Sequence, residues 1–503
     1  MTKPRLIFFT VAFGVFVAAD DLTAVSTMLR QIIFDLEIPL PDGLDRAVWI
    51  VNAYLIAYLA VMPFMGRVSD IWGRRPVFMA AMAIFLIGSI WVPLAGSLES
   101  LIVGRVLTAV GGGAMVPVAM AVVGDIYPPQ RRPSAFGLLG AIETAGWVWG
   151  PLYGALLVRY LSWRWQFYLN IPLAIVGLIL AWWALRQLPP PARRGQIDWA
   201  GSILLTTGLV ALSTALLNSG SIGVVDQLAD LTGRQPVVTW PYYLVAAVAF
   251  VLFILVEQRV ADPLLNLHLF TRPNVSPAMI VNLLVGSVLI IAMVNVPLVV
   301  NIMEFDIGQA ALDSGRLLSA MTASMALLAY AGGRLTERSG YRWVTVAGLA
   351  ACAAALLLMG SQWTADTAYR EMGWQLALLG VGFGLVIAPI AAAVINAAPD
   401  DQRGIAASLV IVLRLVGMSV GLSALTAWGL YRFELLRRQI ELPLLTDPGF
   451  QAAVIRGLTE ASIQALTEAF LLSAAIMAVA LLISLWLGHN PQSGLAAGEQ
   501  PEE

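Results

Sequence analysis

Apolar segments of about 20 residues recur along the whole chain, which is the length that an α-helix needs to cross a bilayer. Short polar stretches separate them. The first segment is too long for a cleavable signal peptide and holds acids near its end, so we expect it to remain as a helix. The pattern predicts an all-α polytopic membrane protein with fourteen spans, at residues 6–29, 47–65, 76–95, 100–123, 135–158, 166–186, 199–218, 242–257, 276–303, 310–331, 343–361, 373–397, 404–430 and 466–487.

The composition agrees with a chain that lies mostly in lipid. Of the 503 residues, 59% are hydrophobic and 12% are charged. Soluble globular proteins carry about 25% charged residues. So few charges cannot cover the water-facing surface of a protein of this length, and we therefore expect lipid to be the main solvent.

Several classes of site are excluded by the residue counts. Cys352 is the single cysteine and there are two histidines, so neither a disulfide framework nor a histidine or thiolate metal site is expected. Lys3 is the single lysine, and no P-loop can be built on it. The net charge of −2 without a basic block argues against nucleic acid as a partner. We expect no cofactor, no catalytic residue and no metal.

The positive residues predict the orientation of the chain. An even number of spans places both termini on one side of the membrane. Arginine and lysine are more numerous in the N-terminal segment and the even-numbered connections than in the odd-numbered ones. Because cytoplasmic loops carry the excess of positive charge, both termini are predicted to be cytoplasmic.

Two motifs occur twice. The stretch Gly66–Arg75 follows the second span, and its spacing of glycine, arginine and acid recurs in Gly333–Arg342 after the tenth span. A proline, an arginine and an alanine around Arg132 recur around Arg403. Both copies of each motif fall on the same predicted side, so the halves are parallel repeats, the arrangement of major facilitator transporters.

The repeat predicts the domain organisation. We expect a six-helix bundle over 1–188, a linker with two additional helices over 189–262, a second six-helix bundle over 263–490 and a polar tail over 491–503. Within the second bundle, the outer connection 431–465 alternates apolar and charged residues. This alternation favours an amphipathic helical extension, and an ordinary surface loop is the alternative.

The first short loop has the features of a conformational latch. Gly66 and Gly73 permit a tight turn between two helices. Asp70 can meet the N-terminus of a neighbouring helix or an arginine, and Arg74 and Arg75 suit a cytoplasmic loop. A simple excess of positive charge would explain the arginines but not the spacing of the glycines and the acid.

The fifth span carries a face for close packing. Gly146, Gly150 and Gly154 recur every four residues, which allows helices to approach closely, and Pro151 permits a bend. Packing alone is one interpretation. Glu143 lies on the same helical face, however, and packing does not explain a buried acid.

Ionisable residues inside the spans are candidates for function because each costs about 2.5–3.5 kcal/mol at the bilayer centre. We interpret Asp21 and Glu143 as proton carriers in a cavity between the halves. The alternatives are a static ion pair for Asp21 and a structural hydrogen bond for Glu143. The adjacent Asp20 points elsewhere on the helix, and we expect it to be solvated or to cap a helix.

Five stretches of the sequence resemble known families. Gly66–Arg75 resembles the loop signature of the major facilitator superfamily, and Gly146–Gly154 resembles the motif G-x-x-x-G-P-x-x-G of its proton-driven exporters. Asp21–Val25 resembles the motif D-x-T-x-V of the fourteen-span drug:proton antiporter group. Met28–Arg30 and Trp49–Val51 are similar to the mycobacterial efflux proteins that export triacylglycerides.

The resemblance implies a major facilitator fold of two parallel six-helix bundles plus two extra central helices. It places Arg105 on the fourth helix opposite Asp21, as an ion-pair partner, although the polar amide usual three residues later in that helix is replaced by Thr108. Arg414 lies in a run similar to the group's penultimate helix. We expect Arg414 to pair with Asp70 across the halves, and the alternative is that it reaches the lipid headgroups.

Together these features predict a monomeric secondary transporter of the inner membrane that exports a lipophilic or amphipathic compound in exchange for protons. Two cargo classes remain open, lipids or glycolipids and hydrophobic drugs. A polytopic membrane enzyme, or a sensor or channel with the shape of a transporter, is the alternative. The protein's expected partners are its cargo, protons and membrane lipids.

Overall fold

A computed structural model describes residues 3–38, 49–188, 197–232, 238–260, 263–265, 267–304, 307–440 and 450–488. These residues form helices and no strands, apart from short turns of 3₁₀ helix and connections. The helices are α1 (Lys3–Asp35), α3 (Trp49–Trp72), α4 (Arg74–Leu94), α5 (Leu98–Ile126), α6 (Arg132–Tyr160), α7 (Arg164–Ala184), α8 (Trp199–Thr232), α9 (Trp240–Glu257), α10 (Val275–Met303), α11 (Ile307–Gln362), α12 (Tyr369–Ala397), α13 (Arg403–Arg437) and α14 (Phe450–Ser484).

The predicted all-α membrane architecture is confirmed. Among the described residues, twelve helical segments are long and apolar enough to cross a membrane. One of them lies in α11, which holds two of the predicted segments on either side of Gly340. Gly340 has φ 78°, a left-handed conformation that favours glycine. The helix α6, which holds another predicted segment, is not among the twelve, so the count of fourteen spans stays a prediction.

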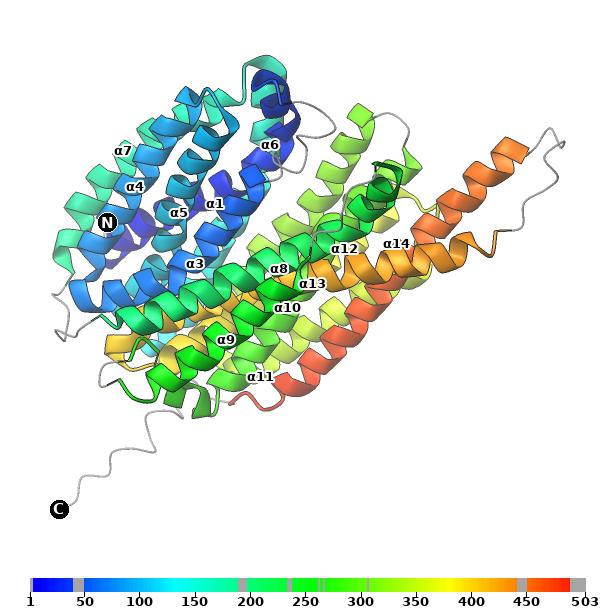
Figure 1. Ribbon diagram of the computed structural model, residues 1–503. Helices are drawn as coiled ribbons and strands as arrows, with labels where there is room; N and C mark the ends of the chain where they lie inside the picture. Colours follow the sequence, from blue (N-terminus) through cyan, green and yellow to red (C-terminus); the bar gives the residue numbers. More distant parts are fainter. Residues whose placement is uncertain are drawn as a thin grey trace.

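The helices gather into two bundles (Figure 1). Helices α1 and α3–α7 form the first bundle, and α10–α14 form the second. Helices α8 and α9 pack on each other, and α8 contacts both α3 of the first bundle and α13 of the second. The two helices between the halves therefore lie along the junction of the bundles.

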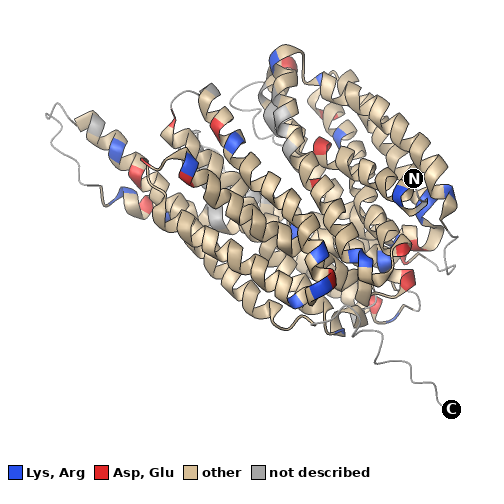
Figure 2. Cartoon of the chain, turned by 180° about the vertical axis from the view of Figure 1, so that it is seen from behind, with Lys and Arg blue, Asp and Glu red and all other residues tan. Residues whose placement is uncertain are grey.

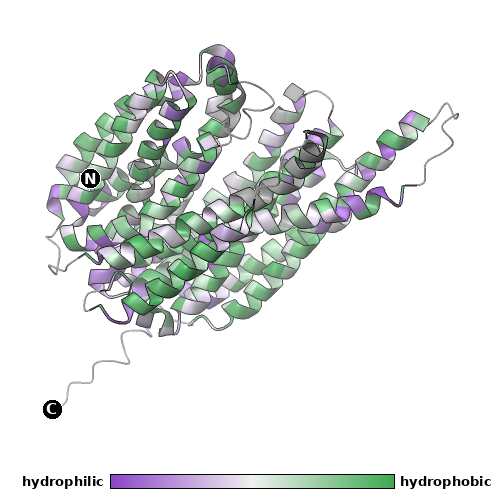
Figure 3. Cartoon of the chain, in the orientation of Figure 1, coloured by the Kyte–Doolittle hydropathy of each residue, from purple (hydrophilic) through white to green (hydrophobic). Residues whose placement is uncertain are grey.

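The outside of the bundles is apolar, as lipid requires. Figure 3 shows hydrophobic residues along the outer faces of the helices. Large apolar side chains such as Leu244, Leu482 and Trp486 are exposed there. Charged residues gather near the helix ends, with few at mid-height (Figure 2). The few buried charges inside the bundles are therefore the exceptions that need an explanation.

The two halves meet closely at the end that carries the loop Gly66–Arg75, here called the motif end. A Cβ atom placed on Gly66 would overlap the backbone of Gly404, and one on Gly137 would overlap that of Ala329. Gly333 has the same relation to Pro133. In Figure 1 the ribbons of the two bundles converge at this end and diverge toward the other.

At the opposite end, α13 and α14 extend beyond the other helices (Figure 1). Arg432 and Glu468 form an ion pair between them, and Leu436 packs against Ala461 and Ala465. The predicted helical extension of the connection 431–465 is confirmed where the structure describes it. The sequence Asp447-Pro448-Gly449 in this connection predicts a turn, but it lies outside the described residues.

Candidate functional site

The first buried charge site lies inside the first bundle, where α1, α5 and α7 meet. Arg105 Nη1 donates to Asp21 Oδ2 at 2.7 Å. Asn170 Nδ2 donates to the other oxygen, Asp21 Oδ1, at 3.0 Å. The side chains of Asp21 and Arg105 are 0% and 1% exposed. The ion pair predicted between these two residues is therefore present, and Asn170 is a further partner that the sequence did not predict.

Aromatic rings enclose the guanidinium of Arg105. The ring of Tyr54 lies 4.0 Å from its central carbon and that of Phe167 lies 5.7 Å away. A cation over an aromatic face is stabilised most when water is excluded. The guanidinium of Arg105 is therefore contacted by a carboxylate and by two aromatic rings.

The expectation that Asp20 is solvated or capping is wrong. Asp20 is 5% exposed, and Gln166 Nε2 of α7 donates to its Oδ2 at 2.8 Å. Asp20 Oδ1 and Gln166 Oε1 are both buried and accept no hydrogen bond in the described structure. Because Asp20 and Asp21 are adjacent in α1, their side chains point to different faces of the helix, as predicted. The sequence did not reveal that Gln166 of α7 faces Asp20.

The second buried charge site lies between the bundles. Arg414 Nη2 of α13 is 3.8 Å from Glu143 Oε2 of α6, and the two side chains are 7% and 10% exposed. Both line a cavity between the halves. Asn282 of α10 also lines it and donates a hydrogen bond to Val410 O of α13.

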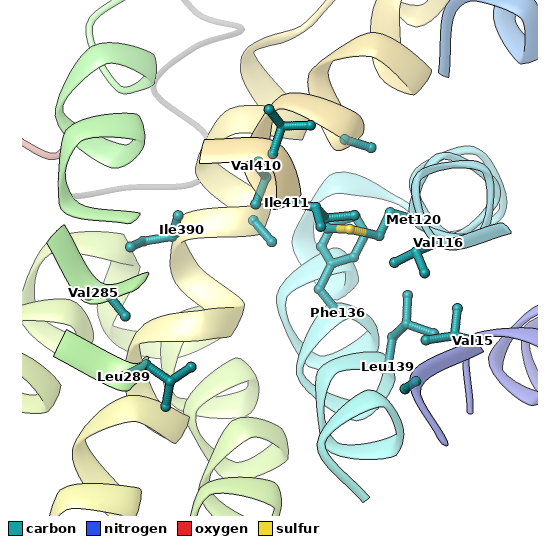
Figure 4. Packing of buried hydrophobic residues seen from close by; sticks show 14 of the residues in the cluster. Val15, Val116, Met120, Phe136, Leu139, Val285, Leu289, Ile390, Val410 and Ile411 are labelled. Carbon is teal, nitrogen blue, oxygen red and sulfur yellow. The ribbon is translucent and has the colours of Figure 1, made fainter. Parts of the chain in front are cut away.

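The walls of this central cavity are apolar on both sides. The first half contributes Val15, Val116, Met120, Phe136 and Leu139, and the second contributes Ile387, Ala391 and Val410. Figure 4 shows side chains of this kind from the two halves facing one another across the junction. The site thus joins one acid and one base to a surface that suits aliphatic or aromatic groups.

The predicted pairing of Arg414 with Asp70 is wrong for this structure, because Arg414 lies beside Glu143. Asp70 instead sits at the N-terminus of α13. Its two oxygens accept from Gly404 N at 2.9 Å and Ile405 N at 3.2 Å, and Arg74 pairs with it at 2.5 Å. A carboxylate is favoured at the positive end of a helix, so the acid of the first half holds a helix of the second half.

Asp125 extends this motif-end latch and was missed by the sequence analysis. It pairs with Arg74 at 3.0 Å and with Arg403 at 3.1 Å. Arg403 belongs to the second half, so Asp125 also joins the halves. The repeat of the segment around Arg132 at Arg403 was the available signal, since it marked both loops as equivalent.

Arg132 makes a parallel link between the halves. Its Nη1 donates to Asn396 Oδ1 at 2.6 Å, and Asn396 Nδ2 donates to Tyr341 Oη at 2.7 Å. Arg67 Nη1 donates to Asp401 O at 3.2 Å. These bonds lie at the motif end and tie the ends of α3 and α6 to the second half.

The remaining residues of the loop have simpler roles. Gly73 has φ 95°, a left-handed conformation that glycine adopts without strain. Arg75 Nη2 donates to Trp182 O at 3.4 Å and stays within the first half. Gly66 does not form the turn that was predicted for it but lies within α3. Together with Asp70 and Arg74 it lies against Gly404 at the contact between the halves, whereas Gly73 shapes the turn and Arg75 does not cross the junction.

The glycine face of α6 packs on α1 beside the first charge site. A Cβ atom on Gly146 would lie 2.9 Å from Phe16 O, and one on Gly150 would lie 2.8 Å from Asp20 O. Gly154 is buried, and Pro151 lies in the same helix. This close packing brings the backbone of α6, with Glu143 one turn before Gly146, against the helix that carries Asp21.

A comparison with known proteins decides the family, because the sequence profile described as the Major Facilitator Superfamily matches residues 11–422. The chain belongs to the major facilitator superfamily. A triacylglyceride transporter of Mycolicibacterium hassiacum is 32% identical over 94% of this chain and 90% of its own length. A triacylglyceride transporter of Mycobacterium tuberculosis is 34% identical over 84% of this chain and 82% of its own length.

Solved structures of the superfamily have the same fold. The proton:xylose symporter XylE, bound to 6-bromo-6-deoxy-D-glucose, superposes with a TM-score of 0.62 at 11% identity, over 96% of this chain and 95% of its own. The human organic anion transporter TETRAN gives a TM-score of 0.61 at 15% identity, over 96% of this chain and all of its own. At these identities the likeness concerns the major facilitator fold alone.

Proposed function

We propose that the protein is a proton-coupled antiporter that exports a lipophilic cargo of the triacylglyceride class across the inner membrane. In this proposal the chain crosses the membrane fourteen times, both termini lie in the cytoplasm, and it works as a monomer. The observation that carries the proposal is the Glu143–Arg414 pair in an apolar cavity between the two halves. Transport is favoured over enzyme chemistry because the site offers a switchable charge pair rather than a nucleophile with an activating base.

Two contact patterns assign different roles to the two acids. Asp21 is held by a short charge-assisted bond and an amide donor. A proton on Asp21 would neutralise the carboxylate and weaken the bond to Arg105. The guanidinium would then rest on Tyr54, and α1 and α5 would be free to shift relative to each other.

Glu143 is held more loosely, by one guanidinium at 3.8 Å, and the cavity around it is lined mainly by apolar side chains. Arriving cargo would displace water and lower the local dielectric constant. Because an unpaired charge is costly in such surroundings, bound cargo favours the state in which Glu143 and Arg414 remain paired. We expect protonation of Glu143 to release Arg414 and the cargo at the outer side. Exchange then follows because cargo and proton favour opposite states of the same pair.

The cargo class rests on three observations. The relatives named above are triacylglyceride transporters. The cavity walls are apolar. The helices α13 and α14 extend beyond the other helices (Figure 1), and Leu436, Ala461 and Ala465 form an apolar cluster between them. Hydrophobic drugs are the second candidate, favoured by the motif Asp21–Val25 of the drug:proton antiporter group.

The test uses inside-out membrane vesicles that contain the protein, a fluorescent triacylglyceride and, separately, a lipophilic cationic dye. An imposed proton gradient should drive the labelled lipid into the lumen. The variant Glu143→Gln should lose most of this transport, because an amide side chain cannot bind and release the coupling proton. The exposed Asp366→Asn serves as the control and should transport normally.

The outcomes separate the candidates. Gradient-driven movement of the dye without the lipid would favour the drug exporter. Lipid movement that persists unchanged in Glu143→Gln, or without a proton gradient, would contradict proton coupling through this site.

A further inference from the structure

A second pair of carboxyl groups lies outside the transport site, where α8 begins and α9 ends. Asp198 immediately precedes α8 and is 8% exposed. Glu257 is the last residue of α9 and is 5% exposed. Neither residue belongs to the charge sites described above, and the two helices that bring them together are those inserted between the halves.

One oxygen of each carboxyl is fully accounted for by a backbone donor. Gly201 N donates to Asp198 Oδ1 at 2.9 Å, which caps the first turn of α8. Leu265 N donates to Glu257 Oε2 at 3.2 Å. The pair thus connects α8, α9 and the segment Leu264–Leu265, which leads into the second bundle and is itself buried.

The other two oxygens are buried and unpartnered. Asp198 Oδ2 and Glu257 Oε1 accept no hydrogen bond from any described residue. A Cβ atom placed on Gly201 would overlap both Asp198 Oδ2 and Glu257 Oε1. The two oxygens therefore face the same small space. Two ionised carboxylates cannot share such a site without a compensating charge.

No arginine compensates them in the described structure. Arg259, which follows α9, is exposed. Arg67 of α3, the helix on which α8 packs, donates to Asp401 O. The segment Leu264–Leu265 carries no charge, and no ion pair of the described residues includes Asp198 or Glu257.

We propose that Asp198 and Glu257 bind one proton between them, as a hydrogen-bonded carboxyl–carboxylate pair. The proton satisfies both unpartnered oxygens at once and leaves the pair with a single negative charge. A metal ion is the less suitable ligand, because Ca²⁺ and Mg²⁺ require about six or more oxygen ligands and two are free here. Release of the proton leaves two adjacent anions, whose repulsion separates α8 from α9.

The consequence for the molecule is a pH-dependent clamp on the two inserted helices. The folded protein retains a proton here that the unfolded chain releases. The free energy of unfolding therefore falls as the pH rises toward the value at which the folded pair loses this proton. This inference does not depend on the proposed function, because it concerns the docking of α8 and α9 and not the movement of cargo.

The experiment measures the thermal unfolding midpoint of the full chain in lipid nanodiscs from mildly acidic to mildly alkaline pH. Infrared spectroscopy of the same samples reports the C=O stretch of protonated carboxyl groups. Wild-type protein should lose stability with rising pH. Glu257→Gln and Asp198→Asn each replace one carboxyl with an amide that can donate permanently, and each should remove this pH-dependent component and part of the infrared band.

Glu460→Gln, an exposed acid-to-amide change on α14, is the matched control and should behave like wild type. An unchanged pH dependence and infrared band in both variants would overturn the proposal. So would stabilisation of wild-type protein by Na⁺ or Mg²⁺ at alkaline pH, which would indicate a cation site. If neither variant folds, the titration of wild-type protein with Na⁺ and Mg²⁺ still tests the proposal. An unfolding midpoint that neither ion changes would support a bound proton.

Discussion

The carboxyl groups of Asp21 and Glu143 differ in how firmly the structure holds them. Asp21 has a guanidinium at 2.7 Å and an amide at 3.0 Å, whereas Glu143 has one guanidinium at 3.8 Å. A buried ion pair is strongly destabilised when one partner is removed, since the other is left uncompensated. Stability and proton coupling therefore have to be separated experimentally at Asp21.

We expect Asp21→Asn to abolish proton-driven transport and to lower the free energy of unfolding by up to about 3–5 kcal/mol, because Arg105 loses its counter-charge. The double variant Asp21→Asn/Arg105→Gln should regain most of the stability but no transport. Denaturation and vesicle transport assays measure the two effects. Recovery of transport in the double variant would mean that the pair is only a static support.

Reversing the charges of the second pair tests its contact directly. Glu143→Arg alone places two cations together, and Arg414→Glu alone places two anions together. Combining them should restore attraction, so the double variant should unfold at a higher temperature than either single variant. If the double variant unfolds at no higher temperature than the less stable single variant, the contact between Glu143 and Arg414 does not contribute to stability.

At this scale the sequence predicted partners best where a motif carried them. The pair Asp21–Arg105 followed from the resemblance. The predicted pair Asp70–Arg414 is wrong because the two residues lie at different levels along α13. Arg414 lies eleven residues beyond the start of α13, which at about 1.5 Å per residue places it about 16 Å from the helix end that Asp70 caps. Residue spacing along one helix does not reveal which level of another helix it faces.

Glycines determine how closely the elements approach at the motif end. Gly66, Gly137 and Gly333 each face backbone of the other half at distances that exclude a Cβ atom. The sequence identified Gly66 and Gly333 through the repeat, and it gave no signal for Gly137, which lies in no motif. Close helix contacts of this kind depend on rotation about the helix axis, which a single sequence does not specify.

We expect Gly137→Val to open the motif end, because its side chain would overlap the backbone of Ala329. A cysteine at the buried position Ser408, beside Gly66, should then react with a thiol reagent at least about tenfold faster, since overpacking costs about 1–3 kcal/mol. The native Cys352 is fully buried and contributes little background. Gly429→Val, where no atom lies within 4 Å, should leave the reaction rate unchanged.

For the whole molecule, the alternation of apolar segments predicted the helices and the parallel repeat predicted two bundles. The lipid-facing surface followed from composition alone, because 12% charged residues leave no other solvent. The conformation in which the motif end is closed could not be predicted, since a transporter sequence encodes more than one arrangement of its halves.

The proposed orientation can be measured with reporter fusions. A reporter that is active only in the cytoplasm should work when fused after Gly488 and fail when fused after Gln362, where the second part of α11 ends at the opposite side. The reverse pattern would invert the predicted topology. Activity at both positions would contradict the span assignment around α11.

Helix α8 touches both bundles, and this limits how they can move. Near its start, Trp199 packs against Phe64 of α3 with ring centroids 5.7 Å apart. Further along, Leu216 O accepts a hydrogen bond from Ser423 of α13 at 2.5 Å. If the two bundles rotate relative to each other, a straight α8 cannot keep both contacts. Such a rotation must therefore break one of the two contacts or bend α8.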